Sequence, residues 1–400
     1  NVWTGGIVLK KNILIIDDSA LMRRVISDII NSDKDFQVKD LANNGLEALD
    51  LVIKSPTGYD AAILDINMPK MNGLQFLEQL NKHNIKLNVV VVSTVAKEGA
   101  KETIRALELG AFDFVTKPDS FVEAKGSNFQ NRILDVLQEI IQATKPSPRY
   151  TTSREIETKE NIAANMEKGR TVSTSSFPYS PLFHEPFPKR ERKIENKVVR
   201  KVPHLRAKNG VVKGSKLIAL ACSTGGPKAL QSVVPFIPAN IDAPMVIVQH
   251  MPEGFTKSLA MRLDEMSKVR VKEAENNDIL EKGVVYIAKG GSQMRVVKCG
   301  NGKYKVTETV EPARNGLKPC ADIMYESLIG SDFNEITCVV LTGMGGDGTL
   351  GIKQLNEKNQ IYCIAQDAET SVVYGMPKVV YEAGLVDEVV PLDAVADAIT

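Results

Sequence analysis

The sequence has little cysteine, histidine and net charge, and each shortage argues against a class of protein. Its five cysteines, at positions 222, 299, 320, 338 and 363, form no Cys-x-x-Cys pair and have no set of histidines nearby, so we expect no zinc site. With 50 basic and 49 acidic side chains, the formal charge of +1 gives no whole-chain signal for nucleic acid. No apolar run approaches the roughly 20 residues that cross a bilayer, so we expect no membrane insertion.

The remaining composition is that of a globular protein. The chain of 400 residues is long enough for two domains with separate cores. Its residues are 43% hydrophobic and 25% charged, as is typical of globular proteins. The first residues lack the charged and then apolar layout of a signal peptide. We therefore expect a cytoplasmic protein.

The first part of the chain alternates between strand and helix patterns. Continuous apolar runs at residues 13–16, 61–64, 89–92 and 112–115 predict strands that are covered on both faces, as in a parallel sheet. Apolar residues recur at helical spacing between 21 and 30, and a closing helix is expected over residues 133–141. This pattern predicts an α/β domain with a doubly wound sheet.

The pattern changes after this domain and then resumes. Residues 145–214 are dominated by proline, serine, threonine and charged residues without apolar periodicity, which indicates a linker. Its basic cluster at 189–193 could contact an anionic partner, although a solvated tether explains it more simply. Strand and helix patterns return over residues 215–400, which predicts a second α/β domain with a mainly parallel sheet.

Polar residues follow several strands of the first domain. Asp17 and Asp18 end the first strand and Asp65 ends the third, while Ser93 and Lys117 follow the fourth and fifth. The carboxyl ends of parallel strands converge on one crevice, and clustered carboxylates favour Mg²⁺. Phosphoryl transfer to a carboxylate needs such a metal, a lysine and a hydroxyl. Taken singly, each aspartate could be only a helix cap or turn former.

At these residues the segment from Lys11 to about Ala124 resembles the receiver domain of response regulators. The resemblance implies a five-stranded, flavodoxin-like domain, which we place at residues 11–130. It also implies that Asp65 accepts a phosphoryl group from a histidine kinase. The residues implied in this chemistry are Asp18, Asp65 and the backbone carbonyl of Asn67 as Mg²⁺ ligands, Asp17 as an assisting carboxylate, and Ser93 with Phe114 as the switch beside Lys117.

Three polar side chains of the second domain also follow strand-like runs. Ser223 comes after residues 217–222, His250 after 244–249, and Asp347 lies in a glycine-rich loop after 337–341. A hydroxyl, an imidazole and a carboxylate are what acyl transfer from an ester requires. Two alternatives stay open, namely that His250 only closes a strand and that the neighbouring thiol of Cys222 is the nucleophile.

The glycine loops of this domain indicate where an oxyanion is held. Gly225 permits close backbone approach at a helix start, Thr224 either caps that helix or bonds within the site, and the amide of Met344 is the expected oxyanion donor. Position 221 is alanine, so the Gly-x-Ser-x-Gly elbow is not matched. The chain order of serine, histidine and aspartate also differs from that of α/β-hydrolases.

Residues 221–226, 249–256 and 341–348 resemble the signature segments of the chemotaxis protein-glutamate methylesterases, the CheB family. Residues 287–290 and 365–377 extend the likeness, whereas residues 315–320 depart from it. The resemblance implies hydrolysis of glutamate γ-methyl esters on chemoreceptors with release of methanol, deamidation of receptor glutamines, and no cofactor at the esterase site. It also predicts a receiver that limits access to Ser223 until Asp65 is phosphorylated.

Two other functions remain open at this point. The second domain could bind receptors or kinase without turnover, or the chain could be a DNA-binding regulator. Near-neutral charge and the lack of a terminal helix-turn-helix pattern argue against the DNA-binding function.

Overall fold

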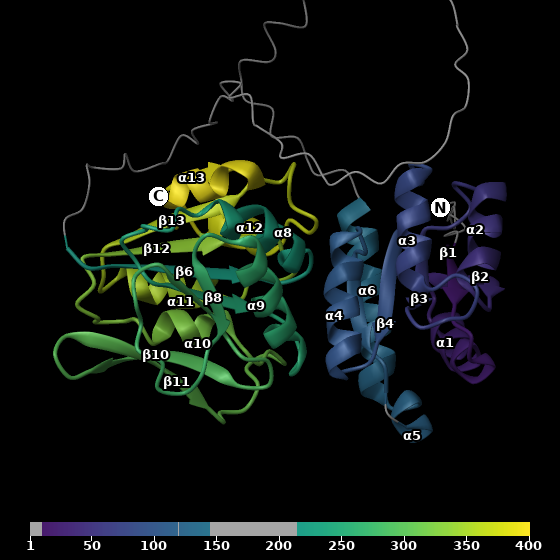
Figure 1. Ribbon diagram of the computed structural model, residues 1–400, viewed down its shortest axis with the longest axis horizontal. Coiled ribbons are helices and arrows are strands. Elements are labelled where there is room, and N and C mark those ends of the chain that lie inside the picture. The colour runs from purple at the N-terminus through teal and green to yellow at the C-terminus, as the bar shows by residue number, and fades with distance from the viewer. Residues whose placement is uncertain (1–9, 119, 145–213) are drawn as a thin grey trace, which may run out of the picture. The chain divides into compact units, whose positions relative to one another are not determined.

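The computed structural model describes residues 10–118, 120–144 and 214–400 (Figure 1). The predicted linker, apart from its last residue, and its basic cluster lie outside the described residues. Within the described part of the chain, no helix combines the length and the apolar character needed to span a membrane.

The first domain is a parallel sheet covered by helices. Its five strands are ordered β2-β1-β3-β4-β5, and every neighbouring pair is parallel, which confirms the predicted sheet. The elements are β1 (Lys11–Ile16), α1 (Ala20–Ser32), β2 (Phe36–Ala42), α2 (Gly45–Lys54), β3 (Ala61–Asp65), α3 (Gly73–Lys82), β4 (Asn88–Ser93), α4 (Lys97–Glu108), β5 (Asp113–Thr116), α5 (Phe121–Ala124) and α6 (Ser127–Thr144).

Alternate residues of strand β1 enter two different cores. Ile13 and Ile15 pack with buried residues of α1 and α6, whereas Leu14 and Ile16 pack with those of α2, α3 and α4. Burial on both faces explains the continuous apolar runs of the strands. Helix α6 begins earlier than the predicted 133–141 because buried Phe129 extends its apolar stripe, and it crosses the predicted domain boundary at 130.

The second domain contains a larger parallel sheet. Its seven strands are ordered β14-β13-β12-β6-β7-β9-β8, and all their pairings are parallel, which confirms the expected α/β architecture. An antiparallel hairpin of β10 and β11 is separate from it. The elements are β6 (Lys216–Cys222), α8 (Gly226–Val233), η1 (Val234–Phe236), β7 (Met245–Gln249), α9 (Phe255–Met266), β8 (Arg270–Glu273), β9 (Val284–Ile287), β10 (Gln293–Cys299), β11 (Lys303–Thr309), α10 (Ala321–Glu326), β12 (Glu335–Val340), α11 (Thr349–Asn356), β13 (Ile361–Gln366), α12 (Met376–Glu382), β14 (Glu388–Val390), η2 (Leu392–Ala394) and α13 (Val395–Ile399).

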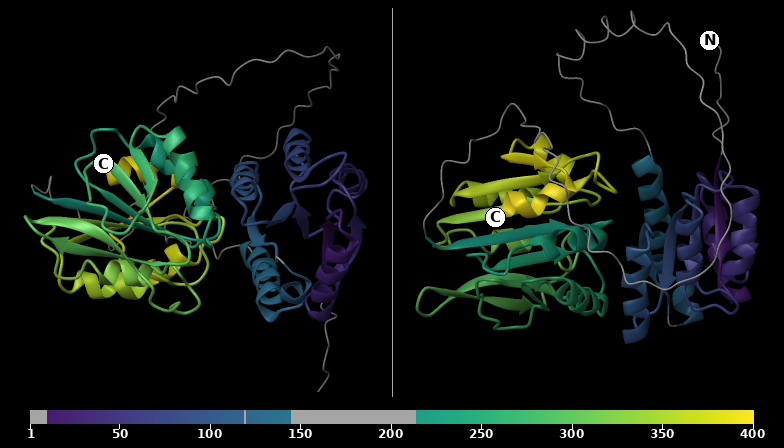
Figure 2. Two further views of the ribbon diagram at one scale, coloured as in Figure 1. Left: turned by 60° about the horizontal axis from the view of Figure 1, so that its bottom comes forward. Right: turned by 45° about the horizontal axis from the view of Figure 1, so that its top comes forward.

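Helices cover both faces of this sheet (Figure 2). Ile218 and Leu220 of β6 pack with buried residues of α8, α9 and α13. Leu217 and Ala219 of the same strand face the opposite core, which contains buried residues of α10, α11 and α12. The carboxyl ends of the central strands β12, β6 and β7 therefore lie at one edge between two rigid helical layers, which is where polar groups of such sheets form sites.

Candidate functional site

Neighbouring strands bring the predicted catalytic residues to one edge of the sheet. Strand β6 pairs with both β12 and β7, so the residues that follow these three strands are close together. The amide of Ser223 donates to the carbonyl of Thr342 at 3.0 Å, and the amide of His250 donates to the carbonyl of Cys222 at 3.1 Å. These bonds continue the ladder past the strand ends and fix the backbone at Ser223 and His250.

The imidazole of His250 is bonded to the carboxylate of Asp347. Nε2 of His250 lies 2.7 Å from Oδ2 of Asp347, and both side chains are more than nine-tenths buried. Burial alone would raise the pKa of Asp347, but the bond to His250 and the amides of Ala321 and Asp322 hold it at about 2. Asp347 is therefore ionised at neutral pH and can orient the imidazole, as in a catalytic triad.

The remaining ring nitrogen, Nδ1, is the one available to take a proton from Ser223. Among the described residues, the hydroxyl of Ser223 makes no hydrogen bond to His250. Both residues line a cavity of about 700 Å³. The role of Ser223 as the nucleophile therefore stays a prediction.

The thiol of Cys222 is poorly suited to be the nucleophile. Cys222 is fully buried, and its thiol donates to Oε1 of Gln249 at 3.0 Å. Burial raises the pKa of this thiol, which disfavours the reactive thiolate. Nε2 of Gln249 donates to the carbonyls of Ser223 and His250 at 3.0 and 3.1 Å. No pattern in the sequence indicates the role of Gln249, whose amide ties the two catalytic turns together.

Glycines allow the loops around Ser223 to approach closely. A Cβ at position 343 would lie 2.8 Å from the Cβ of Ser223, so the loop that precedes Asp347 passes directly beside the nucleophile. Gly225, with a φ of 78°, adopts the left-handed conformation that glycine favours before α8. Met344 follows the close contact at 343, so its amide lies in the loop that passes beside Ser223. Its role as the oxyanion donor stays a prediction.

Thr224 has partners that the sequence did not indicate. Its hydroxyl donates to Oε2 of Glu139 at 2.6 Å and to Oδ2 of Asp113 at 3.2 Å, and both acceptors belong to the first domain. Burial, followed by the charge of Asp113, raises the pKa of Glu139 to about 7. The residue next to Ser223 is thus held by two carboxylates of the first domain, and Asp113 also lines the cavity that contains Ser223.

The acidic pocket of the first domain forms as predicted. Ligand oxygens of Asp17, Asp18 and Asp65 all lie within 4.8 Å of one another. Nζ of Lys117 lies 3.1 Å from Asp65 and 3.4 Å from Asp17. Burial raises the pKa of Asp65 to about 6, although the nearby charge of Lys117 opposes that shift. Three carboxylates with one lysine form an oxygen-rich, anionic site, which fits a hard cation such as Mg²⁺.

The predicted switch residues occupy two different environments. Ser93 is buried, and its hydroxyl donates to the carbonyl of Gly99 at 3.1 Å and accepts from Thr103 at 2.6 Å. Phe114 is buried, and its ring centroid lies 4.5 Å from that of Phe255 in α9. Both side chains therefore connect the strand ends near Lys117 to helices, while their role as a switch remains a prediction.

The side chain of Asn67 contacts helix α4. Its Nδ2 donates to Glu102 at 3.2 Å, so the amide is engaged with α4. The predicted metal ligand is its backbone carbonyl, which this bond leaves unaffected.

Comparisons with known proteins match two separate segments of the chain. The family model described as CheB methylesterase matches residues 218–399, and that of the response regulator receiver domain matches residues 13–124. A protein-glutamate methylesterase/protein-glutamine glutaminase of Syntrophomonas wolfei is 36% identical over 394 residues, which cover 98% of each chain. One of the same name from Pyrococcus abyssi is 36% identical over 390 residues, which cover 98% of this chain and 93% of that one.

A solved structure is also similar. The crystal structure of the Thermotoga maritima CheB methylesterase catalytic domain is 40% identical, with a TM-score of 0.45, and covers 46% of this chain and 97% of that domain.

Proposed function

This chain belongs to the CheB methylesterase family and carries a response regulator receiver domain, and from that premise we propose that it is a phosphorylation-activated protein-glutamate methylesterase of chemotaxis. Its substrates are glutamate γ-methyl esters on chemoreceptors, and the same site deamidates receptor glutamines. The protein acts in the cytoplasm. The observation that carries the proposal is the buried bond between His250 and Asp347 beside Ser223.

The proposed chemistry is acyl transfer in two halves. Oγ of Ser223 bonds to the ester carbonyl carbon while His250 takes its proton, and the carbonyl electron pair moves to oxygen. The amide of Met344 is the proposed donor to that oxyanion. When the electron pair returns, methoxide leaves with the proton from His250 as methanol. Water then attacks the acyl-serine, again through His250, and the free glutamate is released.

The ionisation state of Asp347 supports these roles. Asp347 is ionised at neutral pH, so it can stabilise the imidazolium that forms in each half. The esterase needs no cofactor in this scheme, because the nucleophile, the base and the oxyanion donor all come from the chain. For a glutamine substrate, the same steps release ammonia in place of methanol.

We propose that the receiver is phosphorylated on Asp65 by a chemotaxis histidine kinase. Asp17, Asp18, Asp65 and the carbonyl of Asn67 are the groups that would hold Mg²⁺, whose charge offsets that of the phosphoryl oxygens when it is bound. Lys117, at 3.1 Å from Asp65, supplies a fixed positive charge beside the same oxygens. Ser93 and Phe114 are the residues through which phosphorylation would reach the helices.

The contacts of Thr224 support a restraining role for the unphosphorylated receiver. Two receiver carboxylates hold the hydroxyl next to Ser223, and receiver residues line the cavity in which an ester would have to bind. Phosphorylation would shift the population away from this arrangement and open the site.

A methanol-release assay tests the proposed function. Purified chain is mixed with membranes that contain methyl-labelled chemoreceptor, with and without acetyl phosphate as phosphodonor. We expect labelled methanol in both samples and about tenfold more with acetyl phosphate, since a shift of ~1.4 kcal/mol between two states produces such a change. Binding of receptor without release of methanol in either sample would instead favour a non-catalytic regulator.

The contact between Thr224 and Glu139 gives a prediction for basal activity. Replacing Glu139 by alanine removes the 2.6 Å hydrogen bond, so the unphosphorylated chain should release methanol about three to ten times faster, as expected for the loss of about 1 kcal/mol of restraint. Methanol release without phosphodonor measures this. Gln142→Ala, an exposed position on the same helix, is the control and should leave the basal rate unchanged. A basal rate in Glu139→Ala no higher than that of the control would contradict the restraint.

A further inference from the structure

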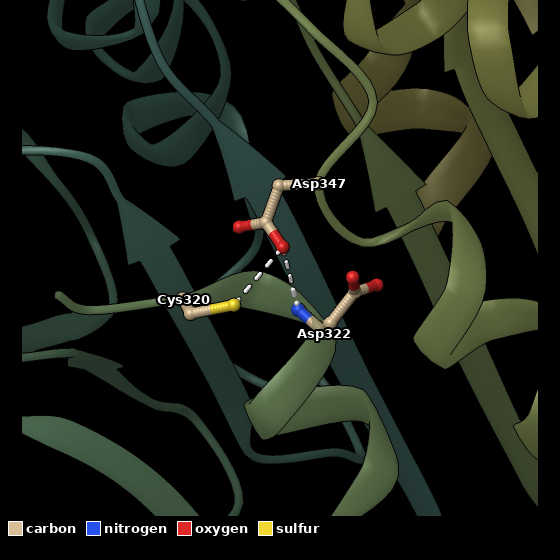
Figure 3. A group of neighbouring side chains, drawn as sticks. All are labelled: Cys320, Asp322 and Asp347. Atoms are coloured by element: carbon tan, nitrogen blue, oxygen red, sulfur yellow. Dashed lines mark hydrogen bonds between the residues drawn. The ribbon is translucent and has the colours of Figure 1, made fainter. Parts of the chain in front are cut away.

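The carboxylate of Asp347 accepts hydrogen bonds from one short segment besides that from His250. Oδ2 accepts from the amide of Ala321 at 2.6 Å, and Oδ1 accepts from the amide of Asp322 at 3.0 Å. The thiol of Cys320 also donates to Oδ1, at 3.1 Å. Figure 3 shows the Cys320 thiol and the Asp322 amide directed at the same oxygen of Asp347. Cys320 and Asp322 thus donate to the oxygen that His250 does not use, while Ala321 donates to the oxygen that His250 also bonds.

The segment at 320–322 also holds the backbone that follows Asp347. Oδ1 of Asp322 accepts from the amides of Gly348 and Gly351 at 2.9 and 2.7 Å. A Cβ at position 351 would lie 2.8 Å from the carbonyl oxygen of Asp322, so only glycine lets the two helices approach this closely. Asp322 is buried, which makes these bonds well shielded from water. The position of Asp347 relative to residues 320–322 is therefore fixed from both sides.

Cys320 is itself held in place. Its amide donates at 2.8 Å to Oε1 of Gln293, a fully buried side chain whose Nε2 donates to the carbonyls of Pro312 and Leu317. Cys320 as a whole residue is only 1% exposed, so its thiol does not reach water. Its direction toward Asp347 follows from this fixed backbone.

The three side chains Cys320, Asp322 and Asp347 are of types that bind metal, and their ligand atoms lie within 4.8 Å of one another. The bonds nevertheless favour a different function. Both oxygens of Asp347 and one oxygen of Asp322 face hydrogen-bond donors, which a cation would have to displace. Burial and the charge of Asp347 raise the pKa of Cys320 to about 12, so the sulfur keeps its proton at neutral pH and acts as a donor.

We propose that Cys320 is a positioning residue of the esterase, whose thiol proton holds the Asp347 carboxylate in the orientation that His250 requires. The inference rests on the proposed function, because it concerns the rate of ester hydrolysis. Cys320 and His250 are the only side chains in the described part of the chain with a hydrogen bond to this carboxylate. The other two donors are backbone amides. Cys320 is therefore the one support of Asp347 that a substitution can remove without touching the imidazole.

The mechanism by which Cys320 acts is indirect. A carboxylate that rotates away from Nε2 of His250 no longer favours the ring form in which Nδ1 is free to take the proton from Ser223. The loss should appear in kcat, since proton transfer belongs to the chemical steps, and KM should change little. A merely structural residue would lower the amount of folded protein without changing kcat per folded molecule.

A set of cysteine variants of the full chain tests the proposal. With saturating acetyl phosphate and methyl-labelled receptor, Cys320→Ala should lower kcat about tenfold, the size expected for a hydrogen bond to a charged group, with KM within about twofold. Cys320→Ser keeps a donor at the same position and should restore kcat to within about threefold of the parent. Cys363→Ala, at a fully buried cysteine in β13, is the control for lost packing and should keep the parent kcat.

The outcomes separate this inference from the proposed function. A parent chain that releases no methanol contradicts the proposed function, whereas an active parent with an unchanged Cys320→Ala variant overturns only the role of Cys320. A serine variant as slow as the alanine variant overturns it as well. In the Asp347→Ala background, Cys320→Ala should cause no further loss, because its effect passes through the carboxylate. If Cys320→Ala fails to fold, the comparison of Cys320→Ser with the parent still decides, since a rate tenfold below the parent contradicts the donor role.

Discussion

Replacing Ser223 by alanine is expected to lower methanol release from methylated receptor by roughly 10⁴-fold to 10⁶-fold, because triad enzymes lose nearly all covalent catalysis with their nucleophile. Ser223 follows β6, lines the same cavity as His250, and lies against the glycine at position 343. The change removes one oxygen from a half-buried position, so folding should not be affected. Labelled methanol, measured with saturating phosphodonor, gives the rate, and near-UV circular dichroism checks the fold.

The neighbouring thiol provides the matched control for this experiment. Cys222→Ser should retain most of the activity, since the new hydroxyl can donate to Gln249 as the thiol does. If the thiol were the nucleophile, the pattern would be reversed, with an active Ser223→Ala and an inactive Cys222→Ser. A Ser223→Ala variant within tenfold of the parent would remove Ser223 from the proposed mechanism.

The positions of the main site residues could be predicted because the sheets are parallel. Ser223, His250 and Asp347 are far apart in the sequence, but each follows an apolar run, and strands of one parallel sheet end at one edge. The same reasoning placed Asp17, Asp65 and Lys117 together, and their contacts in the structure agree with it. A strand that is buried on both faces appears in the sequence as a continuous apolar run. The residue that follows such a run can therefore be placed at the carboxyl end of the strand.

Strand β2 shows where this signal fails. Its sequence over Phe36–Ala42 has buried ends and half-buried or exposed residues between them, because it lies at an edge of the sheet. It therefore lacks the continuous apolar run that identified the other strands of the receiver. The prediction of five strands rests on the resemblance to receiver domains, and the structure confirms it.

The residues that hold the catalytic residues in place could not be predicted from the sequence. Cys320 and Asp322 lie after a loop, and nothing in their spacing from Asp347 indicates a contact. Gln249 ends a strand, but which carbonyls its amide reaches depends on how the following turns fold. The contact of Thr224 with Glu139 depends on the packing of two domains, which neither periodicity nor a local motif encodes.

The receiver is expected to lose its effect on the esterase when Asp65 is changed to asparagine. The amide keeps the shape of the side chain but cannot form the acyl phosphate, so acetyl phosphate should no longer stimulate methanol release, and the stimulated-to-basal ratio should fall from about ten to about one. The basal rate should stay near that of the parent, because Asp65 belongs to a separate sheet from Ser223. A ratio of ten corresponds to ~1.4 kcal/mol between the restrained and open populations.

A control on the same domain makes the Asp65 result specific. Asp28→Asn alters an exposed carboxylate of α1 outside the acidic pocket and should leave the stimulation intact. Equal stimulation of Asp65→Asn and the parent would place the phosphoacceptor elsewhere.

Combining Asp65→Asn with Glu139→Ala tests whether phosphorylation acts through the Thr224 contact. If phosphorylation acts by releasing Thr224, the double variant should have the raised basal rate of Glu139→Ala and no response to acetyl phosphate. A double variant with the low parental basal rate would mean that Asp65 and the Thr224 contact do not act in that order.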